Sequence, residues 1–351
     1  MLPVDEPDES HTETPPAVSQ TVNIGKTPTI GQEKSSEVQD AFNGLSFLVG
    51  VAENKNLAYR AKMEDVHTYI ANFAERVDWG YFAIFDGHAG KQTARWCGNN
   101  LHELLEQAIL SKEEEYGPSD ASPHNLYDVR EILRDVFVKA DELIEQDGSG
   151  TSGCTVATAI LRWETAENTA QEKSYDNHDA KRNFEFLPQK NHRRMLYTSN
   201  VGDLRVVLCR SGRLYRLSYD HKASDHNEIA RVREAGGLIV NHRVNGVFAI
   251  TRSLGDSYIK NLVTGKPFTT ATEITDQDEF LILACDGVWD VLSDEAACKY
   301  VQGVFKQQAE NGQVFDPIEA AKKLCKLAID KGSTDNITVM IVKLDPAVFG
   351  D

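Results

Sequence analysis

Hydrophobic residues lie along this chain in two patterns that predict different elements. Short continuous apolar runs, rich in β-branched and aromatic residues and bounded by turn-forming residues, predict β-strands. These runs lie at 46–52, 66–71, 81–85, 154–163, 195–201, 205–210, 247–251, 280–285 and 337–344. Apolar residues that recur every three or four positions predict helices. The helical segments lie at roughly 90–110, 126–146, 225–235, 293–310 and 317–330.

The order of these elements favours one fold class. The predicted helices come mostly in pairs while the strands cluster in runs, which is typical of an α+β protein with packed sheets and not of an alternating βαβ fold. The chain has 351 residues, of which 41% are hydrophobic. Because one core serves up to about 250–300 residues, we expect a single domain with a tail and an insert.

Polar segments set the expected limits of that domain. Residues 1–44 are rich in Pro, Thr, Ser, Glu and Gln, a composition that buries too little apolar surface to fold, so a disordered tail is predicted. A second polar segment, 165–194, follows a strong strand and is predicted to be a surface insert between two strands. The folded domain is therefore expected at 45–346.

Charge, hydrophobic run length and cysteine usage indicate which partners and which compartment to expect. A net charge of -17 disfavours nucleic acid or an anionic membrane as the main partner, because both would be repelled. The acidic N-terminal sequence predicts no signal peptide, and no run reaches the roughly 18 apolar residues of a membrane span. The six cysteines form no CxxC pair, which predicts reduced core thiols and an intracellular protein.

Aspartates stand next to three of the predicted strands. Asp86 and Asp286 each follow an apolar strand and precede a glycine, and Asp335 comes just before the last strand. A single Asp-Gly pair usually marks a turn. Three carboxylates gathered in one place would instead raise one another's pKa unless a cation neutralised them. Without a His or Cys cluster, such oxygen ligands suit Mg²⁺ or Mn²⁺ better than Zn²⁺.

Two neighbouring motifs have both an ordinary and a functional interpretation. His88 is a structural histidine in the ordinary case, but beside a metal pocket it could donate a proton to a leaving group. Arg60, Glu64 and Asp65 crowd a segment that could equally be a solvated loop.

The GSGTSG stretch at 148–153 fits a dinucleotide-loop template. It follows a helix and opens a strand, however, so it predicts a helix stop with a tight turn.

Taken together, these motifs resemble the metal-dependent type 2C protein serine/threonine phosphatases (the PPM family), and most closely its fungal members. The likeness covers about residues 47–344 and keeps the order of the family's motifs. In this sequence they read RAKMEDVHTYI, FAIFDGHAG, SGCTVATAIL, SNVGDLRVVL, YDHKASD, EAGGLI, VNGVFAITRSLGD, FLILACDGVWDVLSDEAA and STDNITVMIV.

The resemblance implies an α+β fold, a β-sandwich of two mainly antiparallel sheets flanked by paired helices. It also implies a site with two Mg²⁺ or Mn²⁺ ions per chain and a weaker third ion. By motif position, Asp86 would bridge the two ions, the Gly87 carbonyl would bind the first, and Asp286 and Asp335 would bind the second. The acids expected at metal-bound waters are Glu64 and Asp65, and those expected at the third ion are Asp203 and Asp290.

The reaction implied by the resemblance is hydrolysis of phosphoserine and phosphothreonine by a water that bridges the two ions. Arg60 would bind the phosphate with its planar fork, and His88 would protonate the leaving oxygen. Phosphate monoester hydrolysis needs acceleration by up to ~10²¹, of which acid–base catalysis supplies only about 10²–10⁴, so most of the work must be electrostatic.

The expected partners are phosphorylated proteins, among them MAP kinases of stress pathways, with no nucleic acid and no membrane. A monomer in the cytoplasm and nucleus is expected. Two alternatives remain open at this stage. One is a catalytically inactive pseudophosphatase that serves as a binding or regulatory module, which would predict gaps among the metal aspartates. The other is a two-metal nuclease, against which the acidic composition counts.

Overall fold

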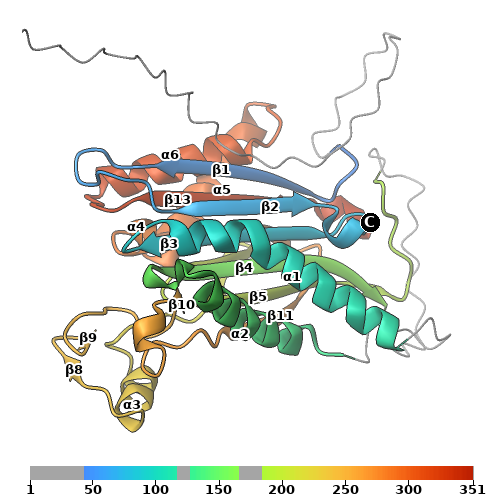
Figure 1. Cartoon of the computed structure of the whole chain (residues 1–351). Coiled ribbons are helices and arrows are strands. Elements are labelled where there is room, and N and C mark those ends of the chain that lie inside the picture. Colours follow the sequence, from blue (N-terminus) through green and yellow to red (C-terminus); the bar gives the residue numbers. More distant parts are fainter. Residues whose placement is uncertain (1–42, 117–126, 166–183, 351) are drawn as a thin grey trace, which may run out of the picture.

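The computed structural model describes residues 43–116, 127–165 and 184–350, and shows a sandwich of two antiparallel sheets (Figure 1). The larger sheet has the order β11-β5-β4-β3-β2, with β10 paired to β4. Its strands are β2 (Val66–Ala71), β3 (Gly80–His88), β4 (Gly153–Thr165), β5 (His192–Val201), β10 (Leu254–Gly255) and β11 (Phe268–Ile274). The other sheet has the order β1-β13-β12-β6-β7. Its strands are β1 (Phe47–Asn54), β6 (Arg205–Arg210), β7 (Arg213–Arg216), β12 (Asp278–Ala284) and β13 (Ile337–Leu344).

Central strands are buried on both faces, which explains why they appear in the sequence as continuous apolar runs. In β3, Phe82 and Ile84 pack between the two sheets, while Tyr81 and Phe85 face the helices on the outside. Strand β12 divides its side chains in the same way between the inner core and an outer core. This alternation follows from the two-residue period of a strand.

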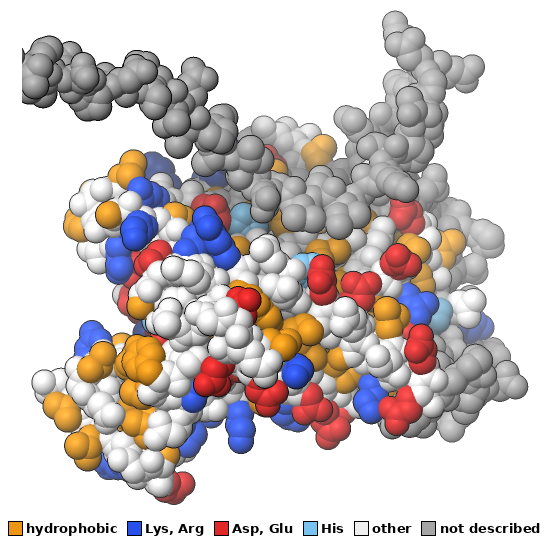
Figure 2. Space-filling view, viewed as in Figure 1, with side chains coloured by type: hydrophobic (Ala, Val, Ile, Leu, Met, Phe, Trp, Pro, Cys, Tyr) orange, Lys and Arg blue, Asp and Glu red, His pale blue; other side chains and the backbone are white. Residues whose placement is uncertain are grey.

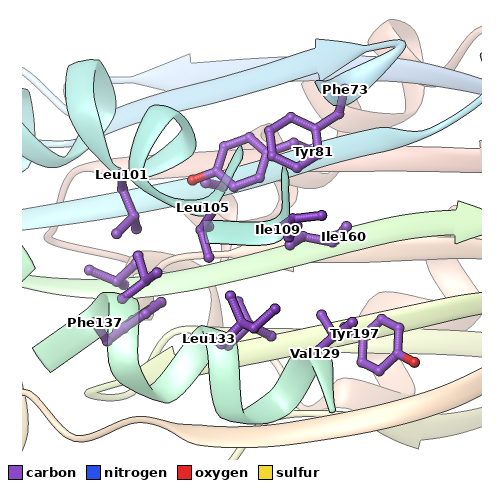
Figure 3. Packing of buried hydrophobic residues seen from close by; sticks show 14 of the residues in the cluster. Phe73, Tyr81, Leu101, Leu105, Ile109, Val129, Leu133, Phe137, Ile160 and Tyr197 are labelled. Atoms are coloured by element: carbon purple, nitrogen blue, oxygen red, sulfur yellow. The ribbon is translucent and has the colours of Figure 1, made fainter. Parts of the chain in front are cut away.

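Paired helices cover the outer face of each sheet. Helices α1 (Gln92–Tyr116) and α2 (Val129–Asp147) pack on the larger sheet, where Leu101, Leu105, Leu133 and Phe137 meet Ile160 of β4 (Figure 3). Helices α5 (Asp294–Glu310) and α6 (Pro317–Asp330) cover the other sheet. Short helical turns complete the elements of the two layers: η1 (Phe73–Glu75), η3 (Ser149–Thr151), α4 (Asp286–Trp289) and η6 (Pro346–Phe349).

A side lobe, residues 221–266 apart from strand β10, projects from one end of the sandwich (Figure 1). It contains α3 (His226–Glu234), the hairpin of β8 (Ile239–Val240) and β9 (Arg243–Val244), and η5 (Ser257–Ile259) around a small core of its own. The strand predicted at 247–251 is wrong, because these residues lie in this lobe and make only isolated bridges. Its apolar residues serve the lobe's core instead of a sheet. In the space-filling view the lobe carries hydrophobic side chains beside Lys and Arg (Figure 2).

Other sequence predictions have mixed outcomes. Strands β2, β6 and β13 and helix α6 begin and end where predicted, while the partly exposed strands β7 and β11 and the two-residue strands β8, β9 and β10 were missed. All six cysteines are buried and free. The GSGTSG stretch is confirmed as a helix stop, since α2 ends at Asp147 and Gly148 has a φ of 77°. No helix in the described ranges is long and apolar enough to cross a membrane.

Strand pairing extends into the stretch predicted as an insert at 165–194. His192 pairs with Thr165, and Phe186 stacks on Trp163 with ring centroids 5.1 Å apart. Residues 166–183 of the predicted insert and residues 1–42 of the predicted tail lie outside the described residues. The domain limits therefore stay a prediction.

Candidate active site

Three strand ends bring their carboxylates together at the end of the sandwich that adjoins the side lobe. Asp86 lies near the end of β3, Asp286 opens α4 two residues after the last residue of β12, and Asp335 stands two residues before β13. Burial raises the pKa of Asp86 well above its usual value, and the charges of Asp65, Asp286, Asp335 and Asp203 raise it further. The pKa of Asp286 is raised well above normal in the same way, by burial and by neighbouring carboxylates. The two sheets pack face to face, so acids about 200 residues apart in the chain share one site.

Asp65 and Cys285 complete the buried part of this cluster. Ligand atoms of Asp65, Asp86 and Cys285 all lie within 4.8 Å of one another. The Thr338 hydroxyl donates a hydrogen bond to Asp65 Oδ2 at 2.6 Å. Burial nevertheless raises the pKa of Asp65 to about 6. Cys285 was not predicted to lie here, although it directly precedes Asp286 and could have been found from that position.

The residues present fit a divalent cation. Several half-buried or buried carboxylates face one another, and Asp286 Oδ1 is buried without a hydrogen-bond partner among the described residues. An uncompensated group of this kind is costly unless a cation pairs with it. A Cβ atom on Gly87 would lie 2.8 Å from the Glu64 carbonyl oxygen, so only glycine lets the backbone pass here. The oxygen-rich donor set suits Mg²⁺ or Mn²⁺.

The segment that carries Arg60 and Glu64 is held by the residues immediately before β13. The Asn336 amide donates to the carbonyls of Lys55 and Lys62 at 2.8 and 3.0 Å, and its oxygen accepts the Glu64 N–H at 2.9 Å. Arg60 forms an ion pair with Asp335 at 2.5 Å and keeps 46% of its side chain exposed. The guanidinium is thus held beside the carboxylate cluster while solvent can still reach it. Asn336 was missed because its role depends on loops that are distant in the sequence.

His88 is held by an aspartate that the sequence prediction missed. Its Nε2 lies 2.7 Å from Oδ2 of Asp256, whose side chain is fully buried, and the Ser253 hydroxyl donates to the same oxygen at 2.6 Å. A Cβ atom at Gly153 would lie 2.0 Å from His88 Nε2 and 2.1 Å from Asp256 Oδ2. Glycine is therefore required beside this pair. The signal was the carboxylate that ends the family-like SLGD stretch.

Asp203 and Asp290 meet at a lysine. Lys222 Nζ lies 3.3 Å from Asp203 Oδ2 and 3.0 Å from Asp290 Oδ1. Asp203 is buried, which raises its pKa, and the nearby Lys222 opposes that increase. The structure thus brings the two acids together around a cationic side chain, which ties the base of the side lobe to them.

Comparison with known proteins places this site in a family. The sequence pattern of the family Protein phosphatase 2C matches residues 49–337, so the chain belongs to that family. The Protein phosphatase 2C homolog 1 of Saccharomyces cerevisiae is 48% identical over 300 residues, which are 86% of this chain and 94% of the relative. The protein of the same name in Schizosaccharomyces pombe is 37% identical, over 94% of this chain and 81% of its own length.

A solved structure supports the fold. A phosphatase from Toxoplasma gondii superposes with a TM-score of 0.64 at 22% identity, covering 86% of this chain and 94% of that one. The predicted β-sandwich is confirmed, and so is the predicted resemblance to fungal members of the family. The chain is a metal-dependent protein serine/threonine phosphatase that uses Mg²⁺ or Mn²⁺ and acts on phosphoproteins.

Proposed function

We propose that this chain hydrolyses phosphoserine and phosphothreonine by direct attack of water, without a phospho-enzyme intermediate. The observation that carries the proposal is the convergence of Asp86, Asp286 and Asp335 from three strand ends into one cluster, in which burial and neighbouring carboxylates raise the pKa values of Asp86 and Asp286. These aspartates and the Gly87 carbonyl would hold two divalent cations, with Glu64 and Asp65 beside them. When bound, such cations lower the pKa of water and offset negative charge on the phosphoryl oxygens.

The protein's own residues supply binding, orientation and a proton. Arg60 binds two phosphoryl oxygens, exchanging its partner Asp335 for the substrate. A water oxygen attacks phosphorus, the bond from phosphorus to the Ser or Thr oxygen breaks, and that oxygen takes a proton from His88. Because His88 Nε2 pairs with Asp256, Nδ1 is the atom able to hand over this proton. Asp256 is thus a positioning residue for His88.

Asp203 and Asp290 are proposed to hold a weaker third cation. The proposal is supported by the contact that both carboxylates make with Lys222, because a positive charge already lies between them. A cation at this place would have to displace the lysine ammonium, which agrees with a weak site.

A direct test is hydrolysis of p-nitrophenyl phosphate with Mn²⁺ or Mg²⁺. Wild type should turn over, and Asp86→Ala should lose nearly all activity because the cluster loses its central carboxylate. Asp276→Ala, at an exposed turn before β12, is the matched control and should behave as wild type. No turnover by wild type, or full activity in Asp86→Ala, would instead favour a binding module without catalysis.

The role of His88 has a separate test. His88→Ala should slow substrates with poor leaving groups most and leave metal affinity unchanged, because the proton matters most where the leaving oxygen is most basic. Equal losses for good and poor leaving groups would remove His88 from the acid role.

We further propose that the substrates include phosphorylated MAP kinases of stress pathways, and that the protein acts as a monomer in the cytoplasm and nucleus, away from membranes. The support is the likeness to fungal members of the family. Phosphoproteomics of a strain lacking the protein, compared with one carrying Asp286→Asn, would identify the substrates. If the phosphorylation of MAP kinases in both strains were the same as in wild type, MAP kinases would be excluded as substrates.

A further inference from the structure

A surface hollow of about 200 Å³ lies next to the chain segments that hold the His88–Asp256 pair, and none of its lining residues belongs to the carboxylate cluster. It sits where α2 ends and η5 of the side lobe begins, and Figure 1 shows this end of α2 next to β10. Its lining residues are Glu145, Gly148, Gly150, Thr151, Ser257 and Tyr258. Three of them belong to the GSGTSG stretch, which has no role in the proposed reaction.

Both walls of the hollow are joined directly to the His88–Asp256 pair. On one side, Ser257 follows Asp256 in the chain. On the other, the GSGTSG stretch ends at Gly153, where a Cβ atom would touch both His88 and Asp256. The Asp256 N–H also donates to the Ser152 carbonyl at 3.0 Å. A polypeptide whose phosphorylated residue reaches His88 would therefore place a neighbouring side chain at this hollow.

The charges around the hollow favour a cation. It lies at the C-terminal end of α2, a 19-residue helix, where the helix dipole attracts positive charge. The last turn of α2 nevertheless carries no basic residue, and it contains Glu145. Within the described ranges, no Lys or Arg forms an ion pair with Glu145, and nearby Lys260 is engaged by Asp141 at 2.8 Å.

The other lining groups also suit a basic side chain. Tyr258 exposes 67% of its surface, so its ring is available to a cation, which aromatic faces attract. Ser257 Oγ is buried at the hollow and has no hydrogen-bond partner within the described part of the chain. A hydroxyl oxygen, a carboxylate and an aromatic face together match an Arg or Lys side chain. The net charge of -17 would draw basic peptides in the same direction.

We propose that this hollow is a subsite for an Arg or Lys side chain of the phosphoprotein substrate, a few residues from the phosphorylated Ser or Thr. The inference rests on the proposed function, since it assumes that the phosphate is hydrolysed beside His88. It makes the enzyme selective for phosphosites that carry a basic neighbour.

The test uses a panel of phosphothreonine peptides in which one Arg moves along an otherwise neutral sequence, each paired with the same peptide carrying Gln instead. The readout is the ratio of kcat/KM between the two members of a pair, measured with the full-length enzyme. General losses of activity cancel in this ratio. For wild type, Arg at one narrow range of positions should raise kcat/KM by roughly tenfold, the size expected for a partly exposed ion pair with a cation–π contact.

Three variants locate the effect. Glu145→Gln should remove most of the Arg advantage, and Glu145→Lys should invert the ratio, so that the Gln member of each pair becomes the better substrate. Glu142→Gln, on the same helix but paired with Lys139 and outside the hollow, should keep the wild-type ratio. A ratio near one for all Arg positions, or equal losses in Glu142→Gln and Glu145→Gln, would overturn the proposal. If wild type failed to hydrolyse p-nitrophenyl phosphate as well, the proposed function itself would fail instead.

Discussion

Replacing Asp65 by Asn should stabilise the metal-free protein at neutral pH and have a much smaller effect in acid. The Asp65 side chain is buried in the carboxylate cluster, and burial raises its pKa from 3.8 to about 6. Asn keeps an oxygen that can accept the hydrogen bond from the Thr338 hydroxyl. The substitution therefore removes the charge while leaving the local geometry in place.

The magnitude follows from the two pKa values. A carboxyl group whose pKa is higher in the folded state binds its proton more tightly there, so ionising it costs stability as the pH rises. The cost is absent well below pH 3.8, grows between 3.8 and about 6, and is complete above that range. At about 1.4 kcal/mol per pKa unit, it reaches about 3 kcal/mol near pH 7.5 but only about 1 kcal/mol near pH 4.5. The free energy of unfolding of Asp65→Asn relative to wild type should thus be about 2 kcal/mol higher near pH 7.5 than near pH 4.5.

The assay is denaturant-induced unfolding of both proteins in a metal chelator at about pH 4.5 and about pH 7.5. Only the difference between the proteins is interpreted, because groups such as His221, whose pKa burial lowers to about 4, destabilise both equally in acid. Excess Mg²⁺ should abolish the gain at neutral pH, since a bound cation would offset the same charge. A difference between the proteins that does not change with pH in chelator would refute the reasoning.

Three further substitutions test the site and the core. Gly287→Ala should destabilise the protein by more than about 2 kcal/mol, because its Cβ would lie 2.1 Å from the Asn336 carbonyl oxygen; wild-type stability in urea would show that the backbone gives way. Asp256→Asn should lower kcat by up to about 10²-fold, and more for phosphopeptides than for p-nitrophenyl phosphate, because His88 loses the carboxylate that orients it; equal effects on both substrates would argue for a purely structural role. Phe137→Ala should cost about 3–5 kcal/mol of unfolding free energy and leave KM unchanged, since the ring is fully buried between α2 and the sheet; a loss below about 1 kcal/mol would mean that the core collapses around the cavity.

Much of the fold was predictable from local patterns. Strand β13 and the middle of β6 are marked by nearly continuous apolar residues, because both of their faces are covered. The half-buried edge strand β2 is marked instead by its β-branched and aromatic residues. The edge strand β7 could not be found in this way, since three of its four residues are exposed and only Leu214 packs against the core. The run at 247–251 was misread because apolar residues of a small lobe have the same composition as a strand.

The sequence by itself determined which acids stand beside rigid strands, and hence predicted that Asp86, Asp286 and Asp335 form a cation site. A glycine or a carboxylate at a strand end is a local feature, and local features survive in a one-dimensional pattern. Only the tertiary structure decided that Asp256 holds His88, that Lys222 joins Asp203 to Asp290, and that Glu145 meets Tyr258 at a hollow. These pairs come from elements up to about 170 residues apart, and their contact depends on how two sheets and a side lobe pack, which no neighbour in the sequence records.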